Sequence, residues 1–492
     1  MKVVYIVIIS LIVSKIAAQS YDYNWPMGIL ENNGNAPFGN AVLHFDTLGH
    51  PLIEKRDLKM NFERTVAAIS DTTGHLIFYT NGCYIANASG DTMQNGEGIN
   101  PGLVHDWVCP QNGYIVQQGA MALPMPGSDQ LYCLLHLAAQ YDPNVGYTYG
   151  PFYYSTIDIS LDNGNGAVVD KNMLLATEAP ESFAVIRHGN GRDWWVIVPE
   201  YLSNKYRIFL LSKQGFTLWA TVSEGPSGSC SRIGSFLASP DGRRLARVQN
   251  CRTIVLDFDR CAGVLTFKNS FERPAFVFAG GGAAFSENAR YLAITEQVAI
   301  ISVDLDKPNP VFDTLVPLDS LIGRSLQTMA RAPNGYWYLN QPHRGRYMPE
   351  LRRLDMPIPG FFSKKGLLLP VYNVRSLPYF PNFRLYDLPG SICDTLGIDT
   401  PVSTYISFED VGKATYYPNP VREMLHLNID IKEDYDKIQF QLYDIYGRVV
   451  LDKVVEAGAS SIFVGDLPNQ IYFANLMIAG KPYLLGKVTK IK

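Results

Sequence analysis

The sequence contains no apolar run long enough to cross a bilayer as a helix. Its most apolar stretch, Val3–Val13, falls short of the roughly 20 residues that a membrane-spanning helix needs. Lys2 precedes this stretch and the small residues Ala17 and Ala18 follow it, an order typical of secretory leaders, whose apolar core needs only about 7 to 15 residues. We therefore expect residues 1–18 to be a signal peptide cleaved after Ala18, with a retained N-terminal membrane anchor as the alternative.

An excess of charge of one sign is also missing. The chain carries 42 Lys and Arg residues against 46 Asp and Glu residues, a formal net charge of −4, and the basic residues are scattered. Such a chain offers no electrostatic footprint for a phosphate backbone, so we expect no nucleic-acid partner. Long stretches with helical periodicity are scarce, whereas Gly, Pro, Tyr and Phe are plentiful, which indicates an all-β chain.

Short motifs of metal, nucleotide and nucleophile sites are missing as well. The seven cysteines include no CxxC pair, and no HExxH, GxSxG or P-loop pattern occurs. We therefore predict no catalytic residue, no metal ligand and no cofactor. Two alternatives stay open: a Ser-His-Asp site, whose members need to meet only in space, and a calcium loop at “DNGNGAVVD” (Asp162–Asp170), which lacks the terminal Glu of an EF-type site.

The cysteines allow one pairing to be proposed. The turn “SPDG” would fold its flanking strands so that Cys230 and Cys251 face each other, and an exported protein meets oxidising conditions. In this turn, Gly242 is the residue expected to take left-handed backbone angles. Cys261 competes for Cys251, and a bulge would shift the register. The odd number of cysteines leaves at least one free thiol, which we expect to be buried.

One pattern repeats along the middle of the chain. “SPDGRRLA” (Ser239–Ala246) is echoed 47 positions later by “SENARYLA” (Ser286–Ala293), and “IVLDFD” is echoed by “ISVDLD” at the same offset. A further turn, “APNG”, begins at Ala332. Looser copies upstream are “SDTTGHLIFY” (Ser70–Tyr79), “PGSDQLYCLL” (Pro126–Leu135) and “HGNGRDWWVIV” (His188–Val198). A period of about 40 to 50 residues, with a tight turn between short strands in each unit, is typical of β-propeller blades.

These six turns, together with the less regular ends, favour seven blades, with six or eight as alternatives. The strand after each turn is nearly continuously apolar, which indicates that neighbouring sheets cover it on both faces. We expect a propeller over residues 19–390, whose ring is closed by a strand from Ser376–Leu388. A linker over 391–412 and a small β-sandwich over 413–492 complete this all-β chain.

The last eighty residues follow a different pattern. Leu425, Leu427 and Ile429 alternate with polar residues, as in a sheet with one solvated face. “YYPNPV”, “YDIYGRVV” and “DLPNQIYFANLMIAGKPYLLGKVTKIK” follow in order and together resemble the type A C-terminal sorting domain of the type IX secretion system. The residues that carry the resemblance are Pro418, Asn419, Pro420, Gly447, Arg448, Leu467, Pro468, Tyr472, Lys487, Lys490 and Lys492. Gln470 departs from the family pattern, which usually has Gly at this place, so a different local turn is expected there.

This resemblance implies export in two steps. The leader would take the chain to the periplasm, where the folded tail would be recognised by the outer-membrane translocon and removed by a sortase-like protease. The product would then be attached to the cell surface or released. An ordinary adhesion-type or immunoglobulin-like module is the alternative for the tail.

The larger part of the chain also resembles known proteins. “AAISDTTGHLIFYTNGCYIAN”, “SFLASPDGRRLA” and “AAFSENARYLAI” are similar to uncharacterised bacterial propeller domains that often precede type A sorting tails. The likeness covers most of Ala41–Leu388. It supports the fold and implies no activity.

Two hypotheses for the propeller remain. The first is a non-catalytic binding module for a glycan, a peptide or an envelope component, in which aromatic residues of expected loops stack on sugars: Trp107, Tyr147, Tyr149 and Tyr347. The second is a glycan lyase or hydrolase, which needs carboxylates, His or Arg clustered at one pocket. The repeated Asp257, Asp259, Asp304 and Asp306 are expected to bind turn amides, with a ring of carboxylates around the channel as the alternative.

Overall fold

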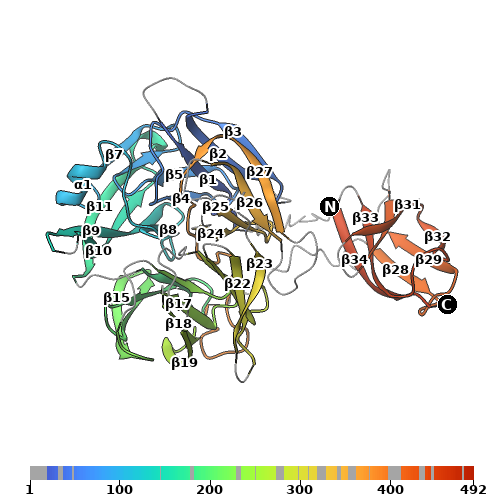
Figure 1. The fold of residues 1–492 in the computed structure, drawn as a ribbon. Coiled ribbons are helices and arrows are strands. Elements are labelled where there is room, and N and C mark those ends of the chain that lie inside the picture. Colours follow the sequence, from blue (N-terminus) through green and yellow to red (C-terminus); the bar gives the residue numbers. More distant parts are fainter. Residues whose placement is uncertain are drawn as a thin grey trace, which may run out of the picture. The chain divides into compact units, whose positions relative to one another are not determined.

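The computed structural model divides into two compact units, Met1–Ile398 and Asp399–Lys492 (Figure 1). The residues that it describes are 19–30, 37–46, 49–144, 146–177, 182–228, 234–249, 251–272, 282–296, 299–307, 310–317, 328–340, 345–352, 362–375, 377–396, 412–431, 438–444, 448–478 and 481–491. The predicted signal peptide with its cleavage site at Ala18, and most of the predicted linker, lie outside these ranges, so both stay predictions.

The first unit consists of short antiparallel sheets that follow one another along the chain (Figure 1). The first sheet holds β1 (Asn24–Ile29), β2 (Gly39–Phe45) and β3 (Pro51–Lys55). The second holds β4 (Ala67–Ser70), β5 (Leu76–Thr80), β6 (Tyr84–Asn87) and β7 (Thr92–Glu97), and the third β8 (Ala120–Pro124), β9 (Leu131–Asp142), β10 (Gly146–Asp158) and β11 (Ala167–Ala176). A single parallel bridge between β7 and β11 joins these two into one eight-stranded sheet.

Four more four-stranded sheets complete the unit. They are β12 (Ala184–Arg187), β13 (Trp194–Pro199), β14 (Lys205–Ser212) and β15 (Gly215–Ser223); β16 (Ser235–Ala238), β17 (Arg244–Val248), β18 (Arg252–Asp259) and β19 (Val264–Glu272); β20 (Ala283–Phe285), β21 (Tyr291–Thr295), β22 (Ala299–Asp304) and β23 (Phe312–Pro317); and β24 (Thr328–Arg331), β25 (Trp337–Asn340), β26 (Gly345–Leu351) and β27 (Phe362–Asn373). Two helices occur in the described residues, α1 (Leu103–Val108) and the 3-10 turn η1 (Asp162–Gly164).

The six predicted turns are all confirmed as the first hairpin of a four-stranded sheet. In each turn a short polar side chain bonds a backbone amide two residues on, as Asp71 does with Thr73, Asp241 with Arg243 and Asn334 with Tyr336. These local bonds, and the positive φ of Gly at turns such as Gly242, fix the hairpin angles without help from the rest of the fold.

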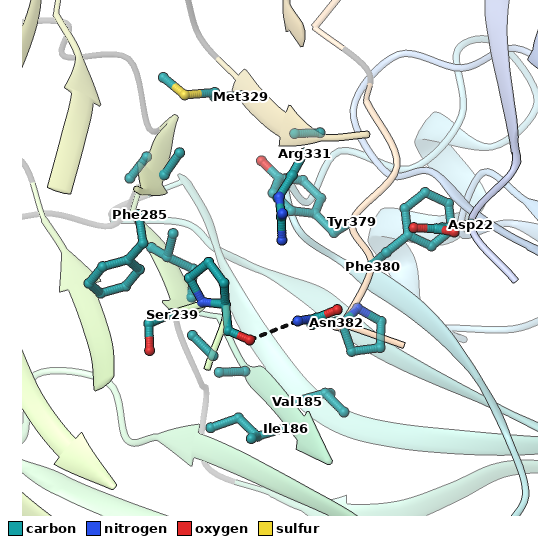
Figure 2. Close-up of a pocket in the computed structure, with 18 of the residues that line it drawn as sticks. Asp22, Val185, Ile186, Ser239, Phe285, Met329, Arg331, Tyr379, Phe380 and Asn382 are labelled. Carbon is teal, nitrogen blue, oxygen red and sulfur yellow. Dashed lines mark hydrogen bonds between the residues drawn. The ribbon is translucent and has the colours of Figure 1, made fainter. Parts of the chain in front are cut away.

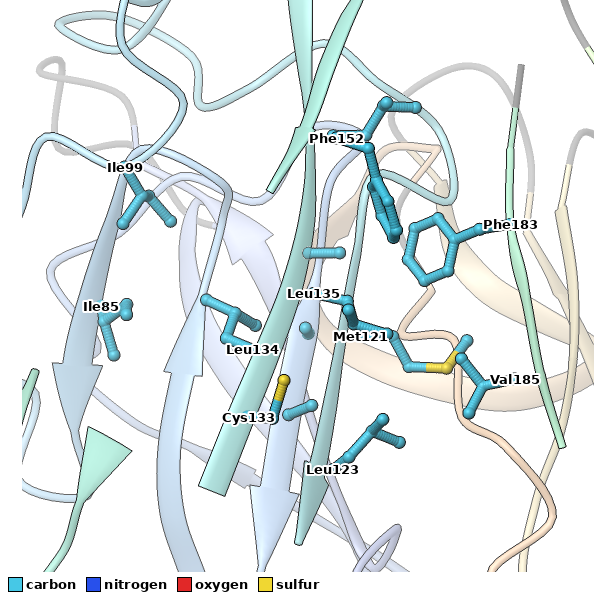
Figure 3. Packing of buried hydrophobic residues seen from close by; sticks show 14 of the residues in the cluster. Ile85, Ile99, Met121, Leu123, Cys133, Leu134, Leu135, Phe152, Phe183 and Val185 are labelled. Carbon is cyan, nitrogen blue, oxygen red and sulfur yellow. The ribbon is translucent and has the colours of Figure 1, made fainter. Parts of the chain in front are cut away.

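The sheets close into a ring because each packs on both of its neighbours. Every pair of adjacent sheets shares a buried apolar cluster: first and second (with Val42 and Tyr79), second to fourth (Figure 3, with Ile85, Leu135 and Val185), fourth and fifth (Ile197, Leu256), fifth and sixth (Val255, Leu292), sixth and seventh (Ala293, Trp337), and seventh and first (Tyr338, Trp25). The described residues therefore form a seven-bladed propeller, and the favoured blade count is confirmed.

Two neighbouring tryptophans illustrate how one strand serves two interfaces. Trp194 and Trp195 are adjacent on β13 and both are fully buried. Trp194 belongs to the cluster shared with the second and third sheets, whereas Trp195 belongs to the cluster shared with the fifth sheet. Alternation along the strand sends the two rings to opposite faces, as predicted.

The expectation of a closing strand from Ser376–Leu388 is wrong. The described residues 377–388 contain no strand, and the first sheet has three strands. Instead, β27 of the seventh sheet lies against β1, β2 and β3, and apolar side chains of both sheets pack together at this interface. Prolines at positions 378 and 381 lack the backbone N–H that a ladder needs, which explains why this segment does not pair.

Disulfides tie distant parts of the first unit together. Cys83 bonds Cys109, and Cys261 bonds Cys393 across 132 positions of sequence. Cys261 is thereby removed as a competitor for Cys251, but Cys230 lies outside the described residues and its pairing with Cys251 stays a prediction. Cys133 is a free and buried thiol, as expected for the odd cysteine.

The second unit is a small β-sandwich. One sheet holds β28 (Gly412–Tyr417), β29 (Met424–Ile431) and β32 (Gly458–Phe463); the other holds β30 (Ile438–Tyr443), β31 (Val449–Val455), β33 (Ile471–Ile478) and β34 (Lys481–Thr489). Leu425, Leu427 and Ile429 are buried between the sheets against Phe440 and Leu476, which confirms the alternation in the sequence. Within the described residues of the whole chain, no α-helix has the length and apolar character that a bilayer crossing requires.

Candidate functional site

A segment without secondary structure, residues 377–394, crosses the propeller; we call it the strap. Leu377 is buried between the seventh and first sheets, and Phe383 is buried against the second to fourth. Farther along, the Leu388 N–H donates to the Gly189 carbonyl at 2.8 Å. The disulfide of Cys393 then pins its end to the fifth sheet. The strap therefore runs from the interface between the seventh and first sheets to the turns of the fourth and fifth sheets.

Beneath the strap lies a cavity of about 450 Å³, lined by the inner strands β12, β16, β20 and β24 (Figure 2). On the strap side, the Asn382 amide donates to the Pro240 carbonyl at 2.7 Å. The buried amide of Gln118 lies across another part of the lining, where it donates to the carbonyls of Phe183 and Phe236. The volume falls in the range of small-molecule sites, about 300 to 1,000 Å³.

Three carboxylates line this cavity. Asp241 accepts the Ser239 hydroxyl at 2.6 Å and the Arg243 amide at 3.1 Å, and the other two pair with arginines. Arg384 donates to both carboxylate oxygens of Asp22 at 2.8 Å. Burial by itself would lower the pKa of Arg384, but Asp22 outweighs burial and the pKa is raised. Arg331 likewise pairs with Glu287. A carboxylate that already accepts from a guanidinium has an oxygen occupied, which disfavours its use as the proton donor in glycoside cleavage.

The four repeated aspartates lie away from the cavity lining. Asp259 accepts the amides of the following turn, and Asp304 accepts the amide of Asp306 at 3.2 Å, as expected for residues that end strands. Asp306 and Asp257 instead pair with Arg244 and other cations in an open cleft of about 720 Å³ between the fifth and sixth sheets. Within the described residues, these aspartates form no ring around the channel.

A serine, a histidine and an asparagine do meet in space, in the order of a nucleophilic triad. His136 lies 2.9 Å from Ser155 Oγ through Nε2 and 2.7 Å from Asn100 Oδ1 through Nδ1. All three residues have zero exposure, and burial lowers the pKa of His136 to about 3. Ser155 also accepts the backbone amide of Asn172 at 3.1 Å. With the serine enclosed from solvent, we interpret the group as a structural network that holds the second and third sheets together.

α1 lies beside the hairpin of β9 and β10 (Figure 1). Exposed aromatic rings from these three elements contact one another. Trp107 of α1 and Tyr147 of β10, both named from the sequence, lie on either side of Tyr141 of β9. Sequence analysis missed Tyr141, although the turn “DPNVG” places it opposite Tyr147 in the ladder. Tyr347 lies on β26 of the seventh sheet, and nothing is described of the Tyr149 side chain.

In the second unit, the first sorting motif holds the last strand. The Asn419 side chain donates to the Lys487 carbonyl at 2.7 Å and accepts the Thr489 amide at 2.8 Å. Pro418 and Pro420 flank it, and both of their peptide bonds are cis.

The other sorting motifs also make defined contacts. Arg448 pairs with the buried carboxylate of Asp444, so its side chain makes a structural contact within the second unit. Tyr472 is fully buried and donates to the Pro468 carbonyl at 2.7 Å, while Leu467 packs against the same core. Gly447 lies outside the described residues. The role of these residues in sorting stays a prediction.

Comparison with known proteins gives one family match. Residues 415–488 match the secretion system C-terminal sorting domain. No curated protein matches the chain in sequence. Similar solved structures include a functionally unknown protein from Desulfotomaculum acetoxidans (12% identity, 72% of this chain and 99% of that chain, TM-score 0.42) and a putative 6-phosphogluconolactonase from Bacteroides uniformis (13% identity, 90% and 99%, TM-score 0.35). No activity of this chain follows from likenesses at this level.

The family match and the contacts of the tail agree with one another. The matched range begins within β28 and ends within β34, so it covers the sandwich that Asn419 ties together. The chain thus ends in a type IX secretion sorting domain, which directs export to the cell surface or out of the cell.

Proposed function

We propose that the exported propeller is a non-catalytic binding module for a glycan, a peptide or another component of the cell envelope. The observation that carries this proposal is that all three cavity acids are already engaged within the protein. Asp22 pairs with Arg384 and Glu287 with Arg331, while Asp241 accepts from the Ser239 hydroxyl and the Arg243 amide. An acid that reacts with a bound sugar needs a raised pKa or a free carboxylate beside the substrate. Here each of the three carboxylates already accepts at least one hydrogen bond from the protein itself.

The test compares binding with turnover. The purified full chain is screened against immobilised glycans and envelope peptides, and the same ligands are incubated with it and analysed for cleavage products. We expect retention of at least one ligand without product. Formation of new reducing ends or unsaturated sugars would favour the alternative of a propeller hydrolase or lyase.

We also propose the route by which the chain reaches its ligand. The leader, residues 1–18, is removed after Ala18 in the periplasm, and the type IX machinery of the outer membrane then engages the sorting domain, which a sortase-like protease removes. The separate core of the second unit supports this division. Deletion of residues 413–492 should leave a folded propeller in the periplasm. Delivery of the shortened chain to the surface would contradict the route.

A further inference from the structure

Three exposed rings form a feature that the fold does not require; we call Trp107, Tyr141 and Tyr147 the aromatic corner. Their exposed fractions are 45%, 44% and 48%. The centroids of Trp107 and Tyr141 are 5.2 Å apart with planes at 73°, and those of Tyr141 and Tyr147 are 5.9 Å apart at 70°. By contrast, Trp25, Trp194 and Trp195 are fully buried. Exposed aromatic side chains in contact with one another mark an interaction site.

The backbone beneath the corner is firmly held. α1 buries Val104 and Val108, and the next residue, Cys109, is bonded to Cys83 of the second sheet. Tyr141 and Tyr147 face each other as partners in the antiparallel ladder of β9 and β10. The rings are therefore presented on a rigid support, which lowers the entropic cost of binding a ligand.

Charge around the corner favours a ligand without negative groups. The segments that supply the rings, residues 99–120 and 131–158, contain several aspartates and no Lys or Arg. Asp106, next to Trp107, has a side chain that is 73% exposed, and Gln140, next to Tyr141, is also exposed. Phosphate, sulfate or uronate groups would find no cation on these segments, whereas hydroxyl donors would find carboxylate and amide oxygens.

Neutral sugars combine the two properties that the corner offers to a ligand. One face of a pyranose ring is made of C–H groups that pack on an aromatic face, and its rim carries hydroxyl groups that hydrogen-bond to oxygen acceptors. A protein partner would instead bury about 1,200 to 2,000 Å² in a stable complex, to which three half-exposed rings supply only a small part.

The angle between the rings also restricts which part of a glycan can bind to the aromatic corner. A stretched polysaccharide needs aromatic faces that lie in one plane, but neighbouring rings of the corner are turned by about 70°. Such a corner encloses a single sugar unit from two sides. It therefore fits the end or a branch of a glycan better than the middle of a long chain.

We infer that the aromatic corner binds the terminal or branching unit of a neutral glycan, an inference that rests on the proposed function of the propeller as a binding module. Trp107 and Tyr147 supply ring faces, and Tyr141 joins them into one surface. Asp106 and Gln140 accept hydrogen bonds from the sugar hydroxyls.

The experiment measures binding of the full chain to a panel of neutral oligosaccharides, alongside sulfated and uronate-containing ones. Trp107→Ala should weaken the Kd for the neutral glycan about tenfold or more. Trp219→Ala is the matched control, because Trp219 is 52% exposed but lies on β15, packed on Trp195. This control should leave the Kd within about twofold of the parent.

A second measurement does not depend on a loss of binding. In a Trp219→Phe background, Trp107 is the one strongly exposed tryptophan among those described, so acrylamide quenching of fluorescence reports on it. Addition of the neutral glycan should reduce that quenching. Equal quenching with and without bound glycan would place the ligand elsewhere.

Each outcome separates this inference from the proposed function. Neutral glycan binding that survives Trp107→Ala would overturn the aromatic corner and leave the binding module standing. Binding of anionic glycans alone, or of no member of the panel, would also overturn the inference. Cleavage of the glycan would overturn the proposed function itself, whatever the effect of Trp107→Ala.

Discussion

Arg384 of the strap donates to both carboxylate oxygens of Asp22, a residue 362 positions earlier in the chain. The pair joins the beginning and the end of the propeller at the place where the first sheet has only three strands. It therefore ties the strap, which follows the seventh sheet, to the segment that precedes the first sheet.

The pair gives a prediction for ring stability. Arg384→Leu leaves the carboxylate of Asp22, only 7% exposed, without its partner, and we expect a loss of about 3 kcal/mol in unfolding free energy. Arg252→Leu is the control, because its partner Glu272 is 68% exposed, and it should cost about 1 kcal/mol or less. Urea denaturation measures both. Equal losses for the two variants would mean that the buried pair of Asp22 and Arg384 stabilises the propeller no more than an exposed pair does.

Gly242 gives a test of the repeated turn. Its φ is +70°, and an added Cβ would lie 2.7 Å from both Arg260 Cδ and Leu385 Cδ2. Gly242→Val should therefore cost about 3 kcal/mol, from backbone strain and overpacking together. Gly335 is the matched control: it takes φ +79° in the corresponding turn of the seventh sheet, and its added Cβ would meet nothing within 4 Å. Gly335→Val should cost only the strain, and thermal unfolding that ranks the two in reverse would refute the packing argument.

The buried His136 predicts acid sensitivity. Its pKa is lowered by burial to about 3 in the folded chain, against about 6.5 when unfolded. Between these values the unfolded state binds a proton that the folded state does not, so the stability present above pH 6.5 falls as the pH drops toward 3. From pH 7 to pH 5 the loss should be about 1 to 2 kcal/mol.

The control for this pH effect is a change at His136 itself. His188, whose pKa burial also lowers, acts in the same direction, so wild type is compared with His136→Gln, which keeps polar atoms but does not titrate. Denaturation series at several pH values should give a flatter curve for the variant. Parallel curves would show that His136 does not contribute.

Asn419 predicts how the sorting domain fails. Asn419→Ala removes the bonds to Lys487 and Thr489, and should destabilise the second unit by about 1 to 2 kcal/mol. Asn428→Ala, at an exposed position of β29, is the control. We expect a lower fraction of the first variant at the cell surface and more in the periplasm, measured by fractionation. Unchanged delivery with a proven loss of stability would show that export tolerates a loosened last strand.

Much of the fold could be predicted because its causes are local. The turn at Ser239–Gly242 and its five relatives are set by side chains that bond amides two residues away, and each following strand is apolar because two neighbouring sheets cover it. The sorting motifs could be identified for a similar reason, since their order along the chain is itself the signal. Adjacent Trp194 and Trp195 had to face opposite ways in any strand.

Other features depend on the ring as a whole, and no local pattern reports them. Ser376–Leu388 is expected to supply the strand that closes the ring, yet residues 377–388 belong to the strap. Their prolines cannot pair in a ladder, and Arg384 donates to Asp22, which lies far away in the sequence. The pairing of Cys261 with Cys393 and the triad-like group at His136 likewise join residues whose distance in sequence says nothing of their distance in space.

The sequence by itself thus determined the repeat, the blade turns and the sorting domain, since these rest on backbone angles, apolar periodicity and motif order. The tertiary structure alone decided which charges neutralise each other in the cavity and which rings meet at the surface. Contacts of that kind arise only when sheets distant in sequence are brought within a few ångströms by packing.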